Sequence, residues 1–340
     1  MAGGAPHRGA EAPVILTPGD PAGIGAEISL KAFAGGCRDF LLMEDPDRLA
    51  GLAEKLRLDI PLRPVDMPDT QGAADETALG VIPLSWPEPP VPGRADPRNA
   101  PVVIEAIARA AEWAQNGKAA GMVTNPVNKA VLTSAGFGHP GHTEFLASMS
   151  PSRPGAPVMM LAGDGIRVVP ATVHIPLREV AGQLNTQALI DKGRILGHAL
   201  RRYFGCEKPR IAVCGLNPHA GEDGQFGDED QSIIAPAVTA LCDEGFAVTG
   251  PHSADTLFHR RARETYDAVI GMYHDQVLIP LKTIDFDGGV NVTLGLDFIR
   301  TSPDHGTAYD IAGTGVARPD SLMAAVRLAR HMALHDNDGG

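Results

Sequence analysis

The sequence is poor in the features that mark proteins outside the ordinary globular class. Only 5% of its 340 residues are aromatic, although 44% are hydrophobic, which is enough for substantial cores. The cysteines form no CxxC pair, so we expect reduced core thiols rather than a disulfide framework. They are Cys37, Cys206, Cys214 and Cys242. No apolar run approaches a membrane span, and residues 1–12, which we expect to be a disordered tail, lack the apolar segment of a signal peptide. We therefore expect a soluble, cytoplasmic protein with no membrane partner.

Positive charge is also scarce. The formal net charge is −12, and no cluster of lysine and arginine stands out along the chain. This balance argues against a nucleic-acid partner. An anionic small molecule would need locally placed cations against such a background, which draws attention to Lys282 and Arg300.

The commonest catalytic signatures are missing as well. The sequence contains neither a GxSxG elbow nor a P-loop, which removes the usual serine-hydrolase and nucleotide-triphosphatase interpretations. Residues Gly136–Gly141 match the letters GxGxxG, but the preceding Leu132–Ala135 is not strand-like. The dinucleotide fingerprint needs a strand directly before it, so we reject this match.

What the chain does contain is a repeated alternation of strand-like and helix-like segments. Apolar residues 13–17 lead through the glycine-rich turn Pro18–Gly25 into a helix from about Ala26, and Phe40–Met43 leads into a helix that Asp45 caps. Further helices are predicted at residues 99–116, with Asn99 as the cap, and at 186–204, 232–244 and 320–335. Such alternation predicts a largely parallel α/β fold, and the length favours two domains.

Three histidines share a position relative to these strands. His174, His219 and His274 each follow an apolar strand-like run, at its carboxyl end. Ligands bind at that edge of an open α/β sheet. One such histidine is more often a loop residue than a ligand, but three in equivalent places favour a shared site. Neutral imidazoles favour zinc or cobalt, and three protein ligands leave positions open for Lewis-acid catalysis.

The stretch from Tyr266 to Gly315 concentrates the remaining candidates. Lys282, Asn291 and Arg300 are suited to gripping an anion. A polar, glycine-punctuated loop follows at residues 304–315. Elsewhere, His142-Thr143-Glu144 is typical of a polar helix start, and His142 there is either structural or available to a ligand.

Several motifs together resemble the 4-hydroxythreonine-4-phosphate dehydrogenase family, within the isocitrate/isopropylmalate dehydrogenase superfamily. The resemblance runs from Pro13 to about Arg330, and the glycine turn carries Ala26 where the family usually has proline. The motifs are Pro18–Glu27, Thr124–Lys129, Gly141–Glu144, Val173–Leu177, Leu216–Glu222, Tyr273–Gln276, Gly289–Leu296, Arg300–Ser302 and Asp304–Gly313.

The resemblance implies a metal-dependent dehydrogenase. It implies a divalent ion (zinc, cobalt or magnesium) on His174, His219 and His274, at a homodimer interface to which both subunits contribute. It implies substrate contacts from His142, Thr143, Lys282, Asn291 and Arg300. NAD or NADP would lie beside a cofactor loop whose residues are Asp304, His305, Gly306, Ala308, Asp310, Ile311 and Gly313.

The implied fold has two α/β domains around a cleft. The first would comprise residues 13–140 and about 296–340, and the second about 141–295, with the metal site and the dimer interface. The implied reaction oxidises a small phosphorylated hydroxy-amino acid, 4-phosphooxy-L-threonine, to a β-keto acid that loses carbon dioxide and leaves 3-amino-2-oxopropyl phosphate, in pyridoxal phosphate biosynthesis. The sequence does not identify the base that removes the hydroxyl proton.

Three other interpretations stay open at this point. A relative in the same family could oxidise a phosphothreonate or the dihydrodiol of an aromatic dicarboxylate with the same metal and cofactor motifs. A three-histidine zinc hydrolase could use metal-bound hydroxide, although it has no use for a dinucleotide loop. A metal-binding or ligand-sensing protein without catalysis is the third.

Overall fold

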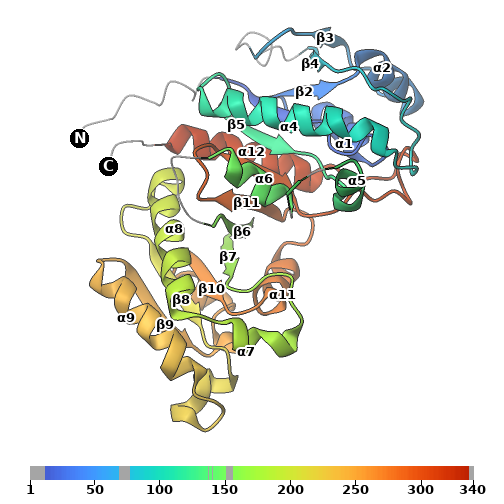
Figure 1. Ribbon diagram of the computed structural model, residues 1–340. Coiled ribbons are helices and arrows are strands. Elements are labelled where there is room, and N and C mark those ends of the chain that lie inside the picture. Colours follow the sequence, from blue (N-terminus) through green and yellow to red (C-terminus); the bar gives the residue numbers. More distant parts are fainter. Residues whose placement is uncertain (1–11, 69–76, 137, 140, 151–155, 337–340) are drawn as a thin grey trace, which may run out of the picture. The chain divides into compact units, whose positions relative to one another are not determined.

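The computed structural model describes residues 12–68, 77–136, 138–139, 141–150 and 156–336. The chain divides into two compact units, unit 1 within residues 1–157 and 296–340, and unit 2 within residues 158–295 (Figure 1). Within these described residues, no helix is long and apolar enough to cross a bilayer.

Unit 1 is built on a parallel sheet with the strand order β3-β4-β2-β1-β5-β12. Its strands are short, and most of their residues are buried because helices cover both faces. They are β1 (Val14–Thr17), β2 (Phe40–Glu44), β3 (Leu62–Pro64), β4 (Leu79–Pro83), β5 (Gly121–Thr124) and β12 (Arg300–Pro303).

Alternate strand residues of unit 1 face opposite layers of helices. Ile15, Leu41 and Met122 belong to a core that helix α4 completes, whereas α12 packs along β12, β5 and β1 and contacts α1. The helices are α1 (Gly25–Ala34), α2 (Pro46–Lys55), α4 (Ala100–Gln115), α5 (Lys129–Ser134), α6 (His142–Ser148) and α12 (Asp320–His335). Because successive side chains of a strand point to opposite faces, each strand contributes to both helix-covered layers of the core.

Unit 2 contains a mixed sheet with the order β11-β6-β7-β10-β8-β9. The pairings β7–β10, β10–β8 and β8–β9 are parallel, and β6 is antiparallel to both β7 and β11. The strands are β6 (Val158–Gly163), β7 (Ile166–Pro170), β8 (Arg210–Cys214), β9 (Ala247–His252), β10 (Ala268–Gly271) and β11 (Val290–Leu294).

The core of unit 2 forms between this sheet and helices on its faces. Val168, Ala212 and Val269 on three neighbouring strands pack with Val277 and Leu281 of α11 in one buried cluster. The helices are α7 (Val180–Gln183), α8 (Thr186–Phe204), α9 (Ala235–Asp243), α10 (Arg260–Arg263) and α11 (His274–Ile284).

The predicted fold class is confirmed, and so are several helix bounds. The predicted helix at 186–204 matches α8, that at 320–335 matches α12, and Asp45 caps α2 by accepting hydrogen bonds from the amides of Asp47 and Arg48. The tail at residues 1–11 lies outside the described residues. Ala12 is described, and its carbonyl accepts a hydrogen bond from Arg330.

Three details of the prediction need correction. Asn99 precedes α4 but does not cap it, because its side chain exchanges two hydrogen bonds with the backbone of Glu88. Residues 141–157 were assigned to the second domain, yet α6 belongs to unit 1, since Leu146 is fully buried in the core with Ile107. Finally, Cys242 is exposed rather than a core thiol.

Candidate functional site

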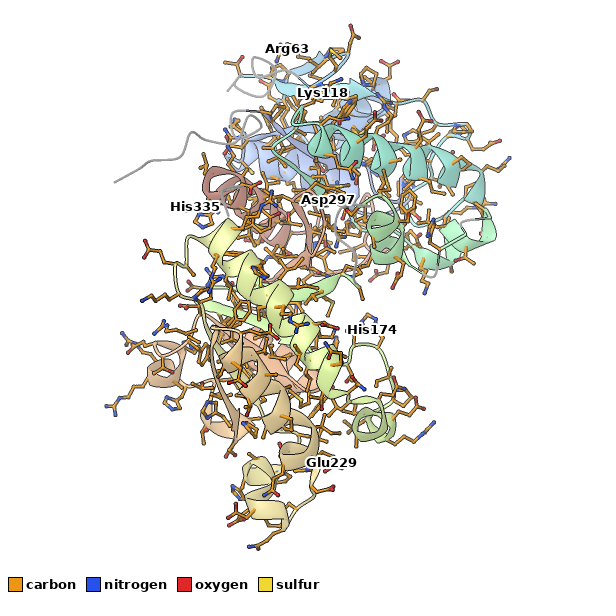
Figure 2. All side chains as sticks on the ribbon, turned by 60° about the vertical axis from the view of Figure 1, so that its left-hand side comes forward. Arg63, Lys118, His174, Glu229, Asp297 and His335 are labelled. Atoms are coloured by element: carbon orange, nitrogen blue, oxygen red, sulfur yellow. The ribbon has the colours of Figure 1, made fainter. Side chains whose placement is uncertain are left out.

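The three histidines follow three strands that lie side by side. The order β7-β10-β8 and the parallel pairings bring the carboxyl ends of these strands to one edge of the sheet. His174 lies in the loop after β7 (labelled in Figure 2), His219 follows β8, and His274 is the first residue of α11 after β10. The predicted placement at one sheet edge is therefore confirmed.

Two of the histidines are neighbours. The ring centroids of His174 and His274 are 5.5 Å apart. Their loops are joined because Thr172 donates from its Oγ1 (2.8 Å) and its amide (3.2 Å) to the Met272 carbonyl. The Nδ1 of His274 lies 2.7 Å from Oδ1 of Asp275. A carboxylate on one ring nitrogen leaves Nε2 as the nitrogen available to a metal.

His219 does not join this pair within one chain. Its ring faces Phe226 at 6.2 Å between centroids. Nowhere in the described part of the chain do three or more His, Cys, Asp or Glu side chains gather closely enough to hold a metal ion. The structure thus brings together two of the three predicted ligands and leaves the third on a separate loop.

The backbone that carries His219 is strained. Five successive residues, 219–223, have positive φ, with values of 55°, 52°, 80°, 39° and 55°. Left-handed backbone costs about 1–2 kcal/mol for each non-glycine residue, and only Gly221 escapes this cost. Such strain persists only where the surroundings impose it, and it concentrates at functional sites.

The donor set of His174 and His274 fits a zinc-type ion. Both are imidazoles, they are close enough to share one ion, and the carboxylate of Asp275 orients one of them. The chain therefore offers two neighbouring imidazoles, one of them oriented by a carboxylate, and an open catalytic site of this kind would need one more protein ligand.

The residues predicted to bind substrate are divided between the units. His142 and Thr143 are the first two residues of α6 and Arg300 begins β12, all in unit 1, whereas Lys282 lies in the last turn of α11 and Asn291 lies on β11, both in unit 2. The Nζ of Lys282 lies 5.4 Å from the centre of the Phe286 ring. The amide oxygen of Asn291 is buried and accepts no hydrogen bond within the described residues.

Arg300 is a buried cation. Its side chain donates from Nη2 to the Thr124 hydroxyl at 2.7 Å, and burial lowers the pKa of its guanidinium to about 10. The group remains protonated at neutral pH, and a nearby anion would offset the desolvation of its charge. This is the environment expected of an arginine that binds an anionic ligand.

The predicted cofactor loop is held against the glycine turn near the amino terminus. The amide of Ile24 donates to the Thr307 carbonyl at 3.1 Å, and the Tyr309 hydroxyl donates to Oδ2 of Asp20 at 2.6 Å. A Cβ on Gly23 would lie 2.9 Å from the Thr307 carbonyl oxygen, so only glycine permits this approach. Burial, and to a lesser extent the hydrogen bond to Asp20, raises the pKa of the Tyr309 hydroxyl above its ordinary value.

The far end of the same loop is fixed by a partly buried ion pair on α1. Glu27, 1% exposed, accepts hydrogen bonds from the amides of Gly315 and Ala317, and Lys31 contacts Glu27 at 2.9 Å. The Nζ of Lys31 also donates to the carbonyls of Gly315 and Ala317. The loop is thus anchored at both ends before any ligand binds.

His305, near the start of this anchored loop, has a ring nitrogen that a ligand could contact. Nδ1 of His305 contacts the Gly306 carbonyl at 3.1 Å, while its Nε2 is buried without a hydrogen-bond partner among the described residues. Ala308 has a positive φ of 44°, and Gly313 one of 70°. A pre-ordered loop with an unpaired buried nitrogen fits the binding of a polar group such as a dinucleotide.

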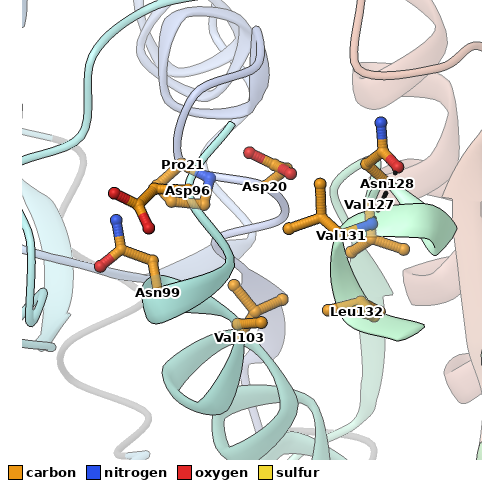
Figure 3. Close-up of a pocket in the computed structure, with 10 residues that line it drawn as sticks. Asp20, Pro21, Asp96, Asn99, Val103, Val127, Asn128, Val131 and Leu132 are labelled. Carbon is orange, nitrogen blue, oxygen red and sulfur yellow. Dashed lines mark hydrogen bonds between the residues drawn. The ribbon is translucent and has the colours of Figure 1, made fainter. Parts of the chain in front are cut away.

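A small pocket opens beside the glycine turn in unit 1 (Figure 3). Asp20 and Asn128 contribute polar atoms to its wall, and its aliphatic lining includes Val103, Val127 and Leu132. Because Asp20 also binds Tyr309, this pocket adjoins the residues that anchor the cofactor loop.

Sequence reasoning missed the residues that position the others. Asp275 is one of them, and its place directly after His274 is a sequence signal for a carboxylate–imidazole contact. Gln276 links the β10–α11 turn to β8, since its Oε1 accepts from the Met272 amide and its Nε2 donates to the Gly215 carbonyl. No local pattern indicates the contact between Gln276 and Gly215, because these two residues are far apart in sequence.

The sheet order, the strand-end histidines and the anchored loop define the class of the protein as an α/β protein of the isocitrate/isopropylmalate dehydrogenase-like fold. Comparison with known families is more specific. The family model described as "Pyridoxal phosphate biosynthetic protein PdxA" matches residues 36–329, and the chain belongs to this family.

The sequence similarity to its relatives extends over nearly the whole chain. A 4-hydroxythreonine-4-phosphate dehydrogenase of Xanthobacter autotrophicus is 50% identical over 95% of this chain and 94% of its own. The crystal structure of the Klebsiella pneumoniae enzyme of the same name has a TM-score of 0.86 at 39% identity, covering 95% and 98% of the two chains. A terephthalate 1,2-cis-dihydrodiol dehydrogenase from Burkholderia xenovorans has a TM-score of 0.63 at 28% identity, covering 94% and 98%.

Proposed function

We propose that the protein is a metal-dependent 4-hydroxythreonine-4-phosphate dehydrogenase that uses NAD or NADP. It oxidises 4-phosphooxy-L-threonine to a β-keto acid, which loses carbon dioxide to give 3-amino-2-oxopropyl phosphate. The observation that carries this proposal is the 50% identity, over 95% of the chain, with a relative of that name. The greater similarity to this relative than to the dihydrodiol dehydrogenase, which is 28% identical, favours a phosphorylated substrate over an aromatic dihydrodiol.

The metal would be held by His174, His219 and His274. A divalent ion in such a site supplies Lewis-acid chemistry, which lowers the pKa of a substrate alcohol. Asp275 keeps the His274 ring in the orientation that presents Nε2. Thr172 and Gln276 fix the turn that precedes His274, so the imidazole is set before the ion binds.

A homodimer would complete this site. His174 and His274 of one chain are neighbours, and His219 of the same chain is not with them. Large apolar side chains on the segments that follow His174 and His274 in the sequence face solvent in the single chain. Leu177 is 69% exposed, Ile279 63% and Phe286 73%. Their burial by a second copy would bring a partner's His219 to the His174–His274 pair.

The substrate would be bound through its anionic groups. Arg300 has a desolvated charge that an anion would offset. The buried amide oxygen of Asn291, which has no partner among the described residues, would instead accept a hydrogen bond from a donor of the substrate such as its hydroxyl or amino group. Lys282, His142 and Thr143 would add donors to the same phosphate end. Fixing that end orients the carbon that loses hydride.

The dinucleotide would lie along residues 304–313. It supplies the hydride acceptor, which no protein side chain provides. The contacts of Thr307 and Tyr309 with the glycine turn order this loop in advance, and this lowers the entropy cost of binding.

A substrate panel tests the activity. Phosphohydroxythreonine, phosphothreonate and an aromatic dihydrodiol dicarboxylate would each be mixed with NAD or NADP, with and without a chelator, and reduced nicotinamide followed by absorbance. We expect turnover of the first substrate and its loss on chelation, with recovery after zinc or cobalt is added. No turnover of phosphohydroxythreonine would refute the proposal, and turnover of another substrate alone would identify the correct relative.

A complementation experiment tests the shared site. His219→Ala and His174→Ala subunits should each be inactive, and mixing them under exchange conditions should restore part of the activity, since one site of each mixed dimer then keeps all three histidines. If all ligands came from one chain, mixing would restore nothing. A normal size-exclusion profile for both variants controls for misfolding.

A further inference from the structure

A fully buried carboxylate lies beneath the loop that carries His219. Asp230 begins the short π-helix Asp230–Ile234 and has no exposed surface. Its Oδ1 accepts a hydrogen bond from the amide of Leu216 at 2.8 Å. Its Oδ2 accepts from the amide of Asn217 at 3.2 Å and from the Asn217 side chain at 3.0 Å. All three donors thus come from the segment between β8 and His219.

The space around this carboxylate is filled by the same loop. A Cβ on Gly215 would lie 2.6 Å from Oδ1 of Asp230, and one on Gly221 would lie 3.3 Å from its Oδ2. The carboxylate therefore contacts the loop on both sides of His219. These contacts account for how the left-handed residues 219–223 keep their conformation, because neighbouring backbone on either side is fixed to one buried group.

The same segment is also tied to the helix that bears His274. The carbonyl of Gly215 accepts a hydrogen bond from Nε2 of Gln276 at 2.8 Å, directly before the amides that bind Asp230. Gln276 and Asp230 thus bind the two ends of one peptide group, Gly215–Leu216, whose C=O and N–H point in opposite directions. These hydrogen bonds fix the start of the His219 loop relative to the β10–α11 turn.

We propose that Asp230 is a positioning residue of the metal site, which acts by fixing the backbone that presents His219. This role rests on the proposed metal site and extends it to a residue that would not touch the ion. Loss of one acceptor oxygen releases the amide of either Leu216 or Asn217 and lets residues 219–223 relax toward ordinary backbone angles. The imidazole of His219 then has to be ordered when the ion binds, so metal affinity falls.

The test uses the full chain and Co²⁺, whose visible absorption reports its ligands. Asp230→Asn keeps the shape of the side chain but replaces an acceptor by a donor. We expect its Kd for Co²⁺, measured by titration and by competition with a chelator, to rise about 10- to 100-fold, as for other residues that orient metal ligands. Asp228→Asn removes the same charge from the same loop and should bind Co²⁺ as the unchanged protein does.

A double-mutant cycle separates positioning from general destabilisation. His219→Ala should weaken Co²⁺ binding and change the absorption spectrum, and adding Asp230→Asn to it should cause no further loss, because the ligand being positioned is already gone. A further loss of similar size in the double variant would overturn the proposal. So would an unchanged Kd and spectrum in Asp230→Asn alone.

Two further outcomes are informative. If Asp230→Asn does not fold, Asn217→Ala takes its place, since it removes one donor to the same carboxylate, and normal Co²⁺ affinity in that variant would overturn the role of Asp230. If the unchanged protein does not bind Co²⁺ at all, the metal site fails, and the positioning role fails with it.

Discussion

The hydroxyl of Tyr309 donates a 2.6 Å hydrogen bond to Oδ2 of Asp20, across 289 positions of sequence. The other oxygen of Asp20 accepts from the amide of Ala22 and so shapes the glycine turn. One carboxylate therefore joins the turn near the amino terminus to the predicted cofactor loop. This contact explains how two motifs at opposite ends of the chain lie together in unit 1.

Tyr309→Phe should weaken dinucleotide binding. The variant loses one hydrogen bond that pre-orders the loop, so about 1 kcal/mol of ordering cost moves into the binding step and Kd rises about fivefold. Fluorescence titration with reduced dinucleotide measures this directly. Tyr266→Phe is a matched control in unit 2, because its hydroxyl donates to the Leu257 carbonyl far from the loop in sequence; equal effects in both variants would contradict the assignment.

Arg300→Ala should act on substrate binding more than on turnover. Removing a buried cation that pairs with a substrate anion costs several kcal/mol, so KM should rise about 100-fold while kcat changes much less. Initial rates over a range of substrate concentrations separate the two. Arg300→Lys should recover only part of the loss, because lysine keeps the positive charge but lacks the planar guanidinium that donates two hydrogen bonds at once. Arg201→Ala, on the surface of α8, serves as the control, and an unchanged KM in Arg300→Ala would remove this residue from the substrate site.

The pair Arg210–Asp267 should make stability depend on pH in the acid range. Burial raises the pKa of Asp267, but hydrogen bonds from Arg210, one of 2.8 Å from its amide and one of 2.9 Å from Nη2, outweigh this and lower it below the ordinary 3.8. Because the folded-state pKa is depressed, the stabilisation is present above about pH 4 and is lost as the pH falls through the folded-state value. Asp267→Asn should lower stability by about 1 kcal/mol at neutral pH and by less at acid pH, measured by urea unfolding. A loss that does not shrink below pH 4 would contradict this interpretation.

Cys242 should react with a thiol reagent before Cys37 and Cys214. Burial raises the pKa of Cys37 to about 11 and that of Cys214 to about 12, so neither forms a thiolate at neutral pH while the chain is folded. Cys242 is exposed and should be labelled first. Mass spectrometry after brief labelling, with and without denaturant, checks the order. Rapid labelling of Cys214 in the folded protein would contradict the described core.

Local patterns in the sequence were sufficient for the alternation of strands and helices and for the strand-end position of the histidines. A helix such as α8 is determined by its own periodicity, its Asn185 cap and its terminal Gly205, which are all local. The same reasoning placed His174, His219 and His274 correctly, because the carboxyl ends of parallel strands meet at one edge. It failed for Asn99, where a contact with Glu88 eleven residues earlier competed with capping.

Only the tertiary structure decided which of these residues meet. The ring of His274 lies beside that of His174 because β7 pairs with β10 and Thr172 donates to the Met272 carbonyl. His219 lies instead on the left-handed turn after β8, next to the segment that donates to Asp230. That the loop near the carboxyl end rests on the turn near the amino terminus follows from Asp20, Tyr309 and the Glu27–Lys31 pair. Such contacts join groups far apart along the chain, and their geometry arises only when the strands are packed in order, so no window of sequence contains it.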